Sequence, residues 1–136
     1  APPMNLIPVA LTGNRVAVGA GIAWQHTGAR PAAGRTILGI RPEKLVLKAP
    51  EEGRIPARVA VIEKLGAETL VGCRLVSTDA AASRLVGQNL LFVKQARNLA
   101  VRHDAMCSLD YSPDDVIWFD EESGRRIMAE RLAATA

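Results

Sequence analysis

The chain has 136 residues, of which 49% are hydrophobic and 23% are charged. This balance excludes an intrinsically disordered chain, because disorder requires low hydrophobicity and a high net charge. The sequence also lacks an apolar run of about 18 residues, the minimum for a membrane-spanning helix. Its length suits one ordinary domain, or two small barrels with a shared core.

The net charge is only +3, from 17 basic and 14 acidic residues. The basic residues are scattered, and only Arg125 and Arg126 are adjacent. A nucleic-acid-binding domain usually concentrates its lysines and arginines on one face and offers aromatic platforms for bases. With 4% aromatic residues in the chain, the sequence predicts no nucleic-acid partner.

The start of the chain is rich in proline and leads into apolar residues, so residues 1–9 are predicted to form a linker. The first residue is Ala1, with no initiator methionine before it. We therefore expect a segment of a longer protein, with processing after translation as the alternative.

Short β-branched runs separated by Gly, Pro, Asn and Asp fill most of the chain, which is typical of an all-β barrel or sandwich. Residues 78–85 predict one helical turn, and residues 129–136 a frayed helix or disordered tail. The many short strands favour closed barrels, which leave no sheet edge exposed. The predicted strands cover residues 14–18, 22–24, 36–40, 45–47, 54–64, 68–76, 90–93, 105–111, 116–119 and 126–128.

The clearest predicted hairpin joins residues 54–64 to residues 68–76, with Gly66 at the turn. Side chains alternate between the two faces of a strand. The alternation therefore predicts one apolar face, which consists of Ile55, Ala57, Val59, Val61 and, at its end, Leu65.

The sequence shows no catalytic apparatus. It contains no GxxxxGK[ST] motif, and Gly19 and Gly21 lack the third glycine of a dinucleotide-binding loop. His26 has no partner at ligand spacing, and His103 with Asp104 is predicted to form a turn. The acidic runs at residues 114–115 and 120–122 lack the spacing of a calcium loop.

The two cysteines, Cys73 and Cys107, are far apart in sequence and form no CxxC pair. They are predicted to be small core residues of a protein in a reducing compartment. From the residues alone, the chain is a β domain with a binding or regulatory role.

Four segments, in order, resemble signatures of the ATPase subunits of maltose- and glycerol-3-phosphate-type ABC importers. Residues 2–6 (PPMNL) resemble the linker that leaves the nucleotide-binding domain. Residues 38–43 (LGIRPE) resemble the signature that follows this linker. Residues 61–71 (VIEKLGAETLV) and 119–127 (FDEESGRRI) resemble the two that follow. The chain is thus similar to the C-terminal regulatory region of that subunit, the transport-associated oligonucleotide/oligosaccharide-binding-like (TOBE) domain.

The resemblance implies an all-β fold of small OB-like barrels with little helix. Residues 1–9 would be the linker, residues 10–128 the regulatory region and residues 129–136 a tail. The fragment would hold no cofactor, metal or catalytic residue, whereas its parent subunit would use ATP and Mg. Expected partners are a second copy, membrane permease subunits reached through the ATPase domain, and a cytosolic regulatory protein. The implied location is cytoplasmic, on the inner face of the membrane.

Eight matched residues form the candidate site. Arg41 precedes Pro42 and should be extended, and Glu43 is placed to pair with Arg41, either within the barrel or between subunits. Glu63 is expected to cap the turn at Gly66 or to bond across the dimer. The full set is Arg41, Pro42, Glu43, Glu63, Gly66, Phe119, Asp120 and Gly124.

Three of these residues have predicted local roles. Gly66 and Gly124 are expected to satisfy backbone geometry at turns. Asp120 is expected to accept hydrogen bonds from the backbone of its own loop.

An alternative function is a small-ligand sensor for an oxyanion or a metabolite. The scattered arginines Arg41, Arg58 and Arg74 would supply the hydrogen-bond donors for an anionic ligand.

Overall fold

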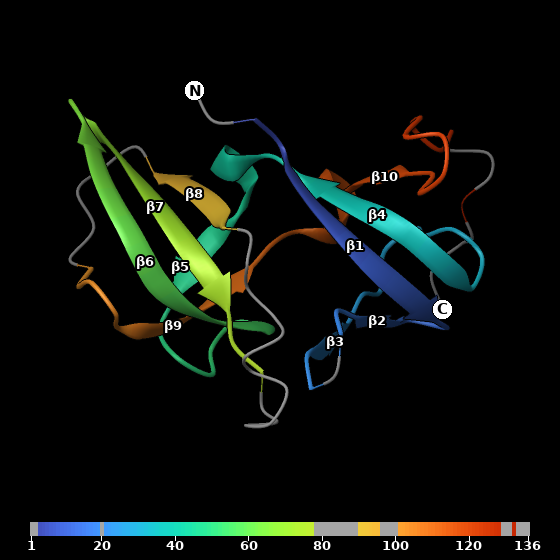
Figure 1. Cartoon of the computed structure of the whole chain (residues 1–136), viewed down its shortest axis with the longest axis horizontal. Helices are drawn as coiled ribbons and strands as arrows, with labels where there is room; N and C mark the ends of the chain where they lie inside the picture. Colours follow the sequence, from blue (N-terminus) through green and yellow to red (C-terminus); the bar gives the residue numbers. More distant parts are fainter. Residues whose placement is uncertain (1–2, 20, 78–89, 96–100, 129–131, 133–136) are drawn as a thin grey trace.

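The computed structural model describes residues 3–19, 21–77, 90–95, 101–128 and 132 (Figure 1). In this part of the chain it contains ten β-strands and two short 3-10 helices, and no α-helix. The all-β, OB-like class predicted from the sequence is confirmed. The helical turn predicted over residues 78–85 lies outside the described residues, as does the tail over 129–136 except for residue 132.

The first sheet contains five antiparallel strands in the order β10-β4-β1-β2-β3 (Figure 1). Four of them come from the N-terminal part of the chain, and the fifth, β10, pairs with β4. The strands are β1 (Asn5–Thr12), β2 (Arg15–Ala17), β3 (Ala23–Gln25), β4 (Gly34–Ile40) and β10 (Ile117–Phe119).

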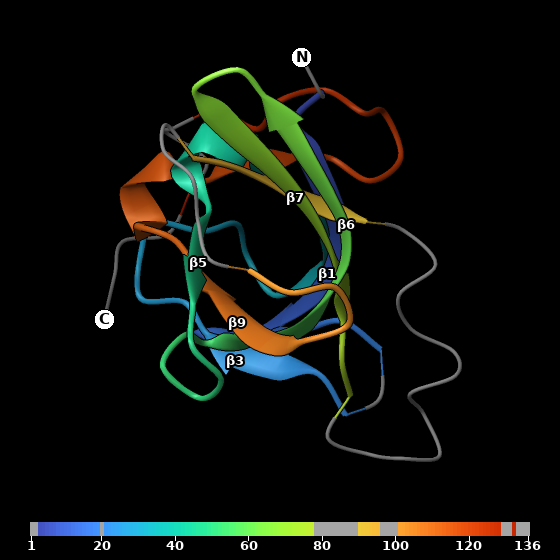
Figure 2. The same ribbon diagram turned by 90° about the vertical axis from the view of Figure 1, so that its left-hand side faces the viewer.

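The second sheet, also of five antiparallel strands, has the order β5-β9-β6-β7-β8. The 3-10 helix η1 (Pro42–Lys44) leads into it from β4, and η2 (Pro113–Asp115) leads back to β10. In Figure 2 its long β6–β7 hairpin lies in front of β1. The strands are β5 (Val46–Lys48), β6 (Ile55–Leu65), β7 (Glu68–Leu75), β8 (Leu91–Gln95) and β9 (Met106–Asp110).

One hydrophobic core serves both sheets. Leu38 and Trp118 of the first sheet and Val71 and Leu109 of the second are each at most 1% exposed within it. Cys73 and Cys107 are also in this core as free thiols, which confirms their prediction as core residues. The sheets therefore bury their apolar faces together.

From Asn5 onward the segment predicted as a linker forms a strand, since β1 begins there and pairs with β4. The strand buries every second side chain, from Asn5 through Ile7 and Val9 to Leu11. Pro8 hid this alternation, since proline seldom occurs inside a sheet. It fits here because β2 pairs only with residues 10–12, so that no described strand pairs with that edge of β1 at Pro8.

The apolar face predicted for β6 is correct for three of its five residues. Ile55, Ala57 and Val59 are buried as predicted, but Val61 is 40% and Leu65 42% exposed. The cause is a register shift between Val59 and Val61. The extra residue of this bulge reverses which side chains face the core and which face solvent. The strand predicted over residues 126–128 is likewise reduced to one bridge, between Phe119 and Arg126.

Asn5 connects the two sheets at the outer edge of β8. Its side-chain amide donates to the carbonyl of Phe92 at 2.9 Å, and its side-chain oxygen accepts from the Phe92 N–H at 2.8 Å. β8 pairs on its other edge with β7. The amide thereby satisfies two backbone groups that an edge strand would otherwise leave unpaired.

We predict that Asn5→Leu destabilises the chain by about 2–4 kcal/mol, since it leaves the N–H and carbonyl of Phe92 without partners. Urea unfolding measures the loss. The matched control is Leu6→Ala, because Leu6 is the next residue and is 53% exposed; its effect should stay within about 0.5 kcal/mol. Equal costs for the two substitutions would contradict this role of Asn5.

Candidate functional site

The first and last signature segments meet the LGIRPE segment at Gly39. β10 pairs with β4 so that Ile117 faces Gly39 and Phe119 faces Ile37. A side chain on Gly39 would place its Cβ 2.7 Å from the Phe119 ring and 2.8 Å from the Met4 sulfur. Glycine at this position therefore lets Phe119 and Met4 pack over the strand.

The residues after β4 turn outward at η1. Arg41 is extended, with φ −71° and ψ 146°, as the following proline predicts. Pro42 is buried, whereas Arg41 and Glu43 are exposed. The predicted ion pair within the chain is not formed, because no salt bridge joins Arg41 and Glu43 in the described structure. Such a pair would gain little at this solvated site.

The tip of the β6–β7 hairpin contains the next two predicted residues. Gly66 has φ +65° and open space where a Cβ would stand, which confirms its backbone role. The turn has two residues, and Gly66 is at the first central position, where a II′ turn requires glycine. Glu63 is exposed opposite Leu70 and does not cap this turn by any hydrogen bond among the described residues.

The loop after β10 is organised by Asp120. Its Oδ2 accepts from the Ser123 N–H at 2.8 Å, and its carbonyl accepts from the Gly124 N–H at 2.8 Å. Gly124 has φ +73°. The local roles predicted for Asp120 and Gly124 are therefore confirmed. Phe119 is half-buried, and its carbonyl accepts from the Thr36 hydroxyl at 2.9 Å.

The same loop is fixed to β4 by Glu121, which accepts a bidentate hydrogen bond from Arg35. The hydrogen bonds and the charge of Arg35 lower the pKa of the Glu121 carboxyl. Because Arg35 is 75% exposed, this pair orients the loop and adds little stability.

A buried polar network joins the two sheets, and no motif or spacing in the sequence indicates it. Arg54, just before β6, donates from Nε to Asp110 Oδ1 at 2.6 Å and also donates to the Tyr111 carbonyl. Its guanidinium carbon lies 4.4 Å from the centre of the Tyr111 ring, a cation–π geometry. A third donation, to the carbonyl of Gln25 at 3.1 Å, reaches the first sheet.

The Tyr111 hydroxyl extends this network into the core. It accepts from Trp24 Nε1 at 2.8 Å and lies 2.9 Å from His26 Nδ1. Since the hydroxyl accepts from Trp24, its own proton is available for His26. The His26 ring also packs edge-on against Trp118, and its Nε2 has no hydrogen-bond partner among the described residues.

The buried setting of His26 keeps its imidazole neutral. The side chain is 0% exposed, and desolvation lowers its pKa from 6.5 to about 4. The backbone of Ala29 opposes this shift, while the charges of Arg54 and Arg30 support it. His26, which the sequence left without a partner, is thus a structural residue of the junction between the sheets.

The described residues contain no group of three or more His, Cys, Asp and Glu side chains placed to hold a metal ion. Nor does any helix among the residues that the structure describes have the length and apolar character to cross a membrane.

The TOBE domain family matches residues 38–119 of the chain. This span covers more than half of the sequence, and the chain belongs to the TOBE domain family. It begins at the LGIRPE segment and ends at Phe119, so it contains the whole second sheet, the last three residues of β4 and all of β10.

The similarity to curated relatives extends beyond residues 38–119 and covers 93% of the chain. The chain is similar to sn-glycerol-3-phosphate import ATP-binding protein UgpC of Ruegeria pomeroyi, with 32% identity over 127 residues, 93% of this chain and 32% of the relative. It is 33% identical over 135 residues to the protein of the same name from Bordetella avium, covering 93% of the chain and 34% of the relative. The resemblance to importer ATPase subunits is confirmed, and the chain spans about a third of the length of these relatives.

We predict that stability falls on acidification because of His26. The unfolded chain takes up its proton near pH 6.5 and the folded chain only near 4, so the folded state is favoured above pH 6.5 and loses this advantage between 6.5 and 4. From pH 7 to pH 5 the loss is about 2 kcal/mol, measured by urea unfolding. His26→Gln should reduce this slope, whereas His103→Gln, at an exposed histidine, should keep it. An unchanged slope in His26→Gln would contradict the prediction.

We predict that Gly39→Ala destabilises the chain by about 1–3 kcal/mol through crowding against Phe119. In a Phe119→Ala background the closest of these contacts is removed, although the Met4 sulfur and the Ile117 carbonyl remain near the added methyl group, so the same substitution should cost less. Thermal or urea unfolding of the four chains gives the coupling. If the cost of Gly39→Ala is the same in both backgrounds, Phe119 is not the neighbour that requires glycine.

Proposed function

We propose that this chain is the regulatory and dimerisation region of the ATPase subunit of an ABC importer for carbohydrate or glycerol-3-phosphate-type solutes. The observation that carries the proposal is the match of 93% of the chain to about a third of each glycerol-3-phosphate import ATP-binding protein. The sequence has no P-loop motif, so the region itself is non-catalytic. ATP and Mg would act in a separate ATPase part of the subunit.

The proposed setting is the cytoplasmic face of the membrane. There the ATPase part would contact the permease subunits, and the TOBE region would be accessible to a cytosolic regulatory protein. A region that regulates through contacts with other proteins needs exposed residues that have no partner within the chain. Some of the matched signature residues are of this kind among the described residues.

The exposed end of β4 suits contact with a second copy. Arg41 and Glu43 carry opposite charges, are exposed, and form no ion pair with each other. Leu6, 53% exposed, faces Gly39 in the register of β1 and β4, close to the same end of the strand. In a two-fold interface, Arg41 of one copy can pair with Glu43 of the other and the reverse. Glu63, exposed on the second sheet, is a further candidate contact.

We predict a concentration-dependent dimer that depends on Arg41 and Glu43. Sedimentation velocity up to about 1 mM detects even an association of about 4 kcal/mol. Arg41→Glu and Glu43→Arg should each weaken the dimer, and the double reversal should restore it; Arg125→Glu, at another exposed arginine, is the control. A chain that stays monomeric, or single reversals without effect, would reject this interface.

The non-catalytic part of the proposal has its own test. The purified chain with ATP and Mg should release no phosphate above the level of a heat-denatured sample. Turnover that survives further purification would overturn it.

A further inference from the structure

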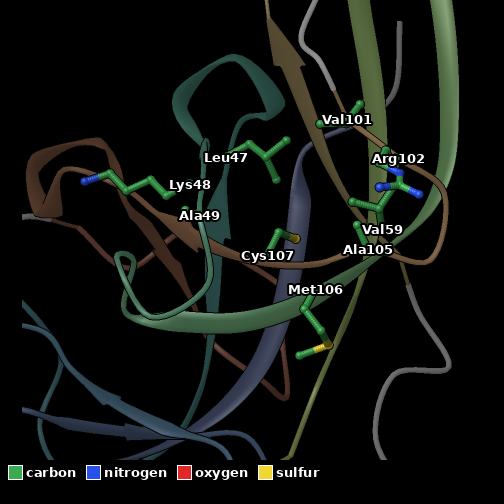
Figure 3. Close-up of a pocket in the computed structure, with 9 residues that line it drawn as sticks. All are labelled: Leu47, Lys48, Ala49, Val59, Val101, Arg102, Ala105, Met106 and Cys107. Carbon is green, nitrogen blue, oxygen red and sulfur yellow. The ribbon is translucent and has the colours of Figure 1, made fainter.

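A pocket of about 300 Å³ opens in the second sheet, away from the signature residues (Figure 3). This volume is at the lower end of the range for small-molecule sites. Its walls come from the end of β5, from β6, from β9 and from the loop before β9. The lining residues are Leu47, Lys48, Ala49, Val59, Val101, Arg102, Ala105, Met106 and Cys107.

The interior of this pocket is apolar. Val59 is 1% exposed and Cys107 7% exposed, so the pocket reaches the core. Leu47, Val101 and Met106 surround them, and Met106 is 41% exposed at the opening. No carboxylate is among the described lining residues. A ligand that fills this space must therefore contribute an apolar group.

The charge at the opening is positive. Arg102 is exposed, and its guanidinium lies beside Val59 on one wall, whereas the Lys48 ammonium extends away from the pocket (Figure 3). Among the described residues, the Arg102 side chain has no hydrogen-bond or ion-pair partner. A free guanidinium is a bidentate donor for a carboxylate or a phosphate.

The rim that presents Arg102 is fixed by the backbone. The paired part of β6 and β9 ends at Arg58 and Met106. Beyond it, the Val59 N–H donates to the Ala105 carbonyl at 2.9 Å, and the Asp104 N–H donates to the Val59 carbonyl at 2.9 Å. Asp104 adopts φ +65° at this turn. Because these bonds hold the loop on β6, the pocket is largely preformed, as ligand sites usually are.

We propose that this pocket binds a small amphipathic anion, a carboxylate or phosphate on a short hydrocarbon chain. The chain would pack against Val59, Leu47 and Met106, and the anionic group would meet Arg102. A bare oxyanion would leave the apolar walls unused, and sn-glycerol 3-phosphate has no hydrocarbon chain to bury there. The proposal is independent of dimerisation, because binding is measured on the chain itself and Arg41 is not among the lining residues.

Calorimetry and thermal unfolding with octanoate and octyl phosphate, below their micelle concentrations, test the proposal. At least one of them should bind saturably and raise the unfolding temperature. Inorganic phosphate, sn-glycerol 3-phosphate and 1-octanol should bind at least tenfold more weakly. If neither amphipathic anion binds, or if phosphate or octanol binds equally well, the proposal is overturned.

Substitutions of lining residues test whether the ligand binds in this pocket. Arg102→Ala should weaken octyl phosphate binding about tenfold, the loss of one charged hydrogen-bonded contact, whereas Arg125→Ala should leave it unchanged. Ala105→Leu should weaken binding of the hydrocarbon chain by filling the opening. In the unmodified chain, octyl phosphate should slow alkylation of Cys107 by N-ethylmaleimide, followed by peptide mass spectrometry. This last measurement needs no variant, and binding without Cys107 protection would place the ligand elsewhere.

Discussion

The arrangement of the two sheets depends on the hydrogen bonds of one arginine. Arg54 lies just before β6 and contacts Asp110 at the end of β9, the carbonyl of Tyr111 after it, and the carbonyl of Gln25 at the end of β3. Its side chain is only 28% exposed, so its charge needs these partners. Because the three partners belong to both sheets, the guanidinium fixes the position of one sheet relative to the other.

The aromatic residues beneath Arg54 make this junction specific. Tyr111 is stacked under the guanidinium and directs its hydroxyl to Trp24 and His26. Burial raises the pKa of the Tyr111 phenol and lowers that of the His26 imidazole, so both rings are held neutral. A neutral pair can remain in the core under an arginine, whereas a protonated His26 would place a second positive charge there. The acid sensitivity predicted for the fold follows from this geometry.

Local pattern was enough to predict most of the strands. The alternating residues around Val16 and Trp24 and the Gly66 turn gave strands and a hairpin that the structure contains. The errors arose where distant contacts override local pattern. β1 was missed because its exposed residues Leu6, Pro8 and Ala10 are as apolar as its buried ones, and proline is rare inside sheets. The exposure of Val61 follows from a register shift that only the pairing with β7 defines.

The candidate site was less predictable than the strands for the same reason. The network of Arg54 joins residues 29 to 57 positions apart in sequence, and none of their spacings is a recognisable motif. Asp120 and Gly124 were predictable because their partners are within the same loop. Arg41 and Glu43 are close in sequence, but nothing in a sequence of one copy shows whether a pair forms within that copy or between two.

The signature residues divide into two groups by what they contact. Gly39, Gly66 and Gly124 provide space or backbone freedom, Pro42 is buried, and Asp120 closes its own loop. These residues build the fold, and their presence identifies the family without locating a partner. Arg41, Glu43 and Glu63 are exposed, and none of the folding contacts described above requires their charges. The part of the signature to which we assign recognition under the proposed function is therefore small and charged. It is separate from the apolar pocket beside Arg102, which no signature residue lines. The two proposals thus assign a protein partner to one surface and a small ligand to another, and the exposed residues Arg41, Glu43 and Arg102 allow each to be tested by substitutions outside the shared core.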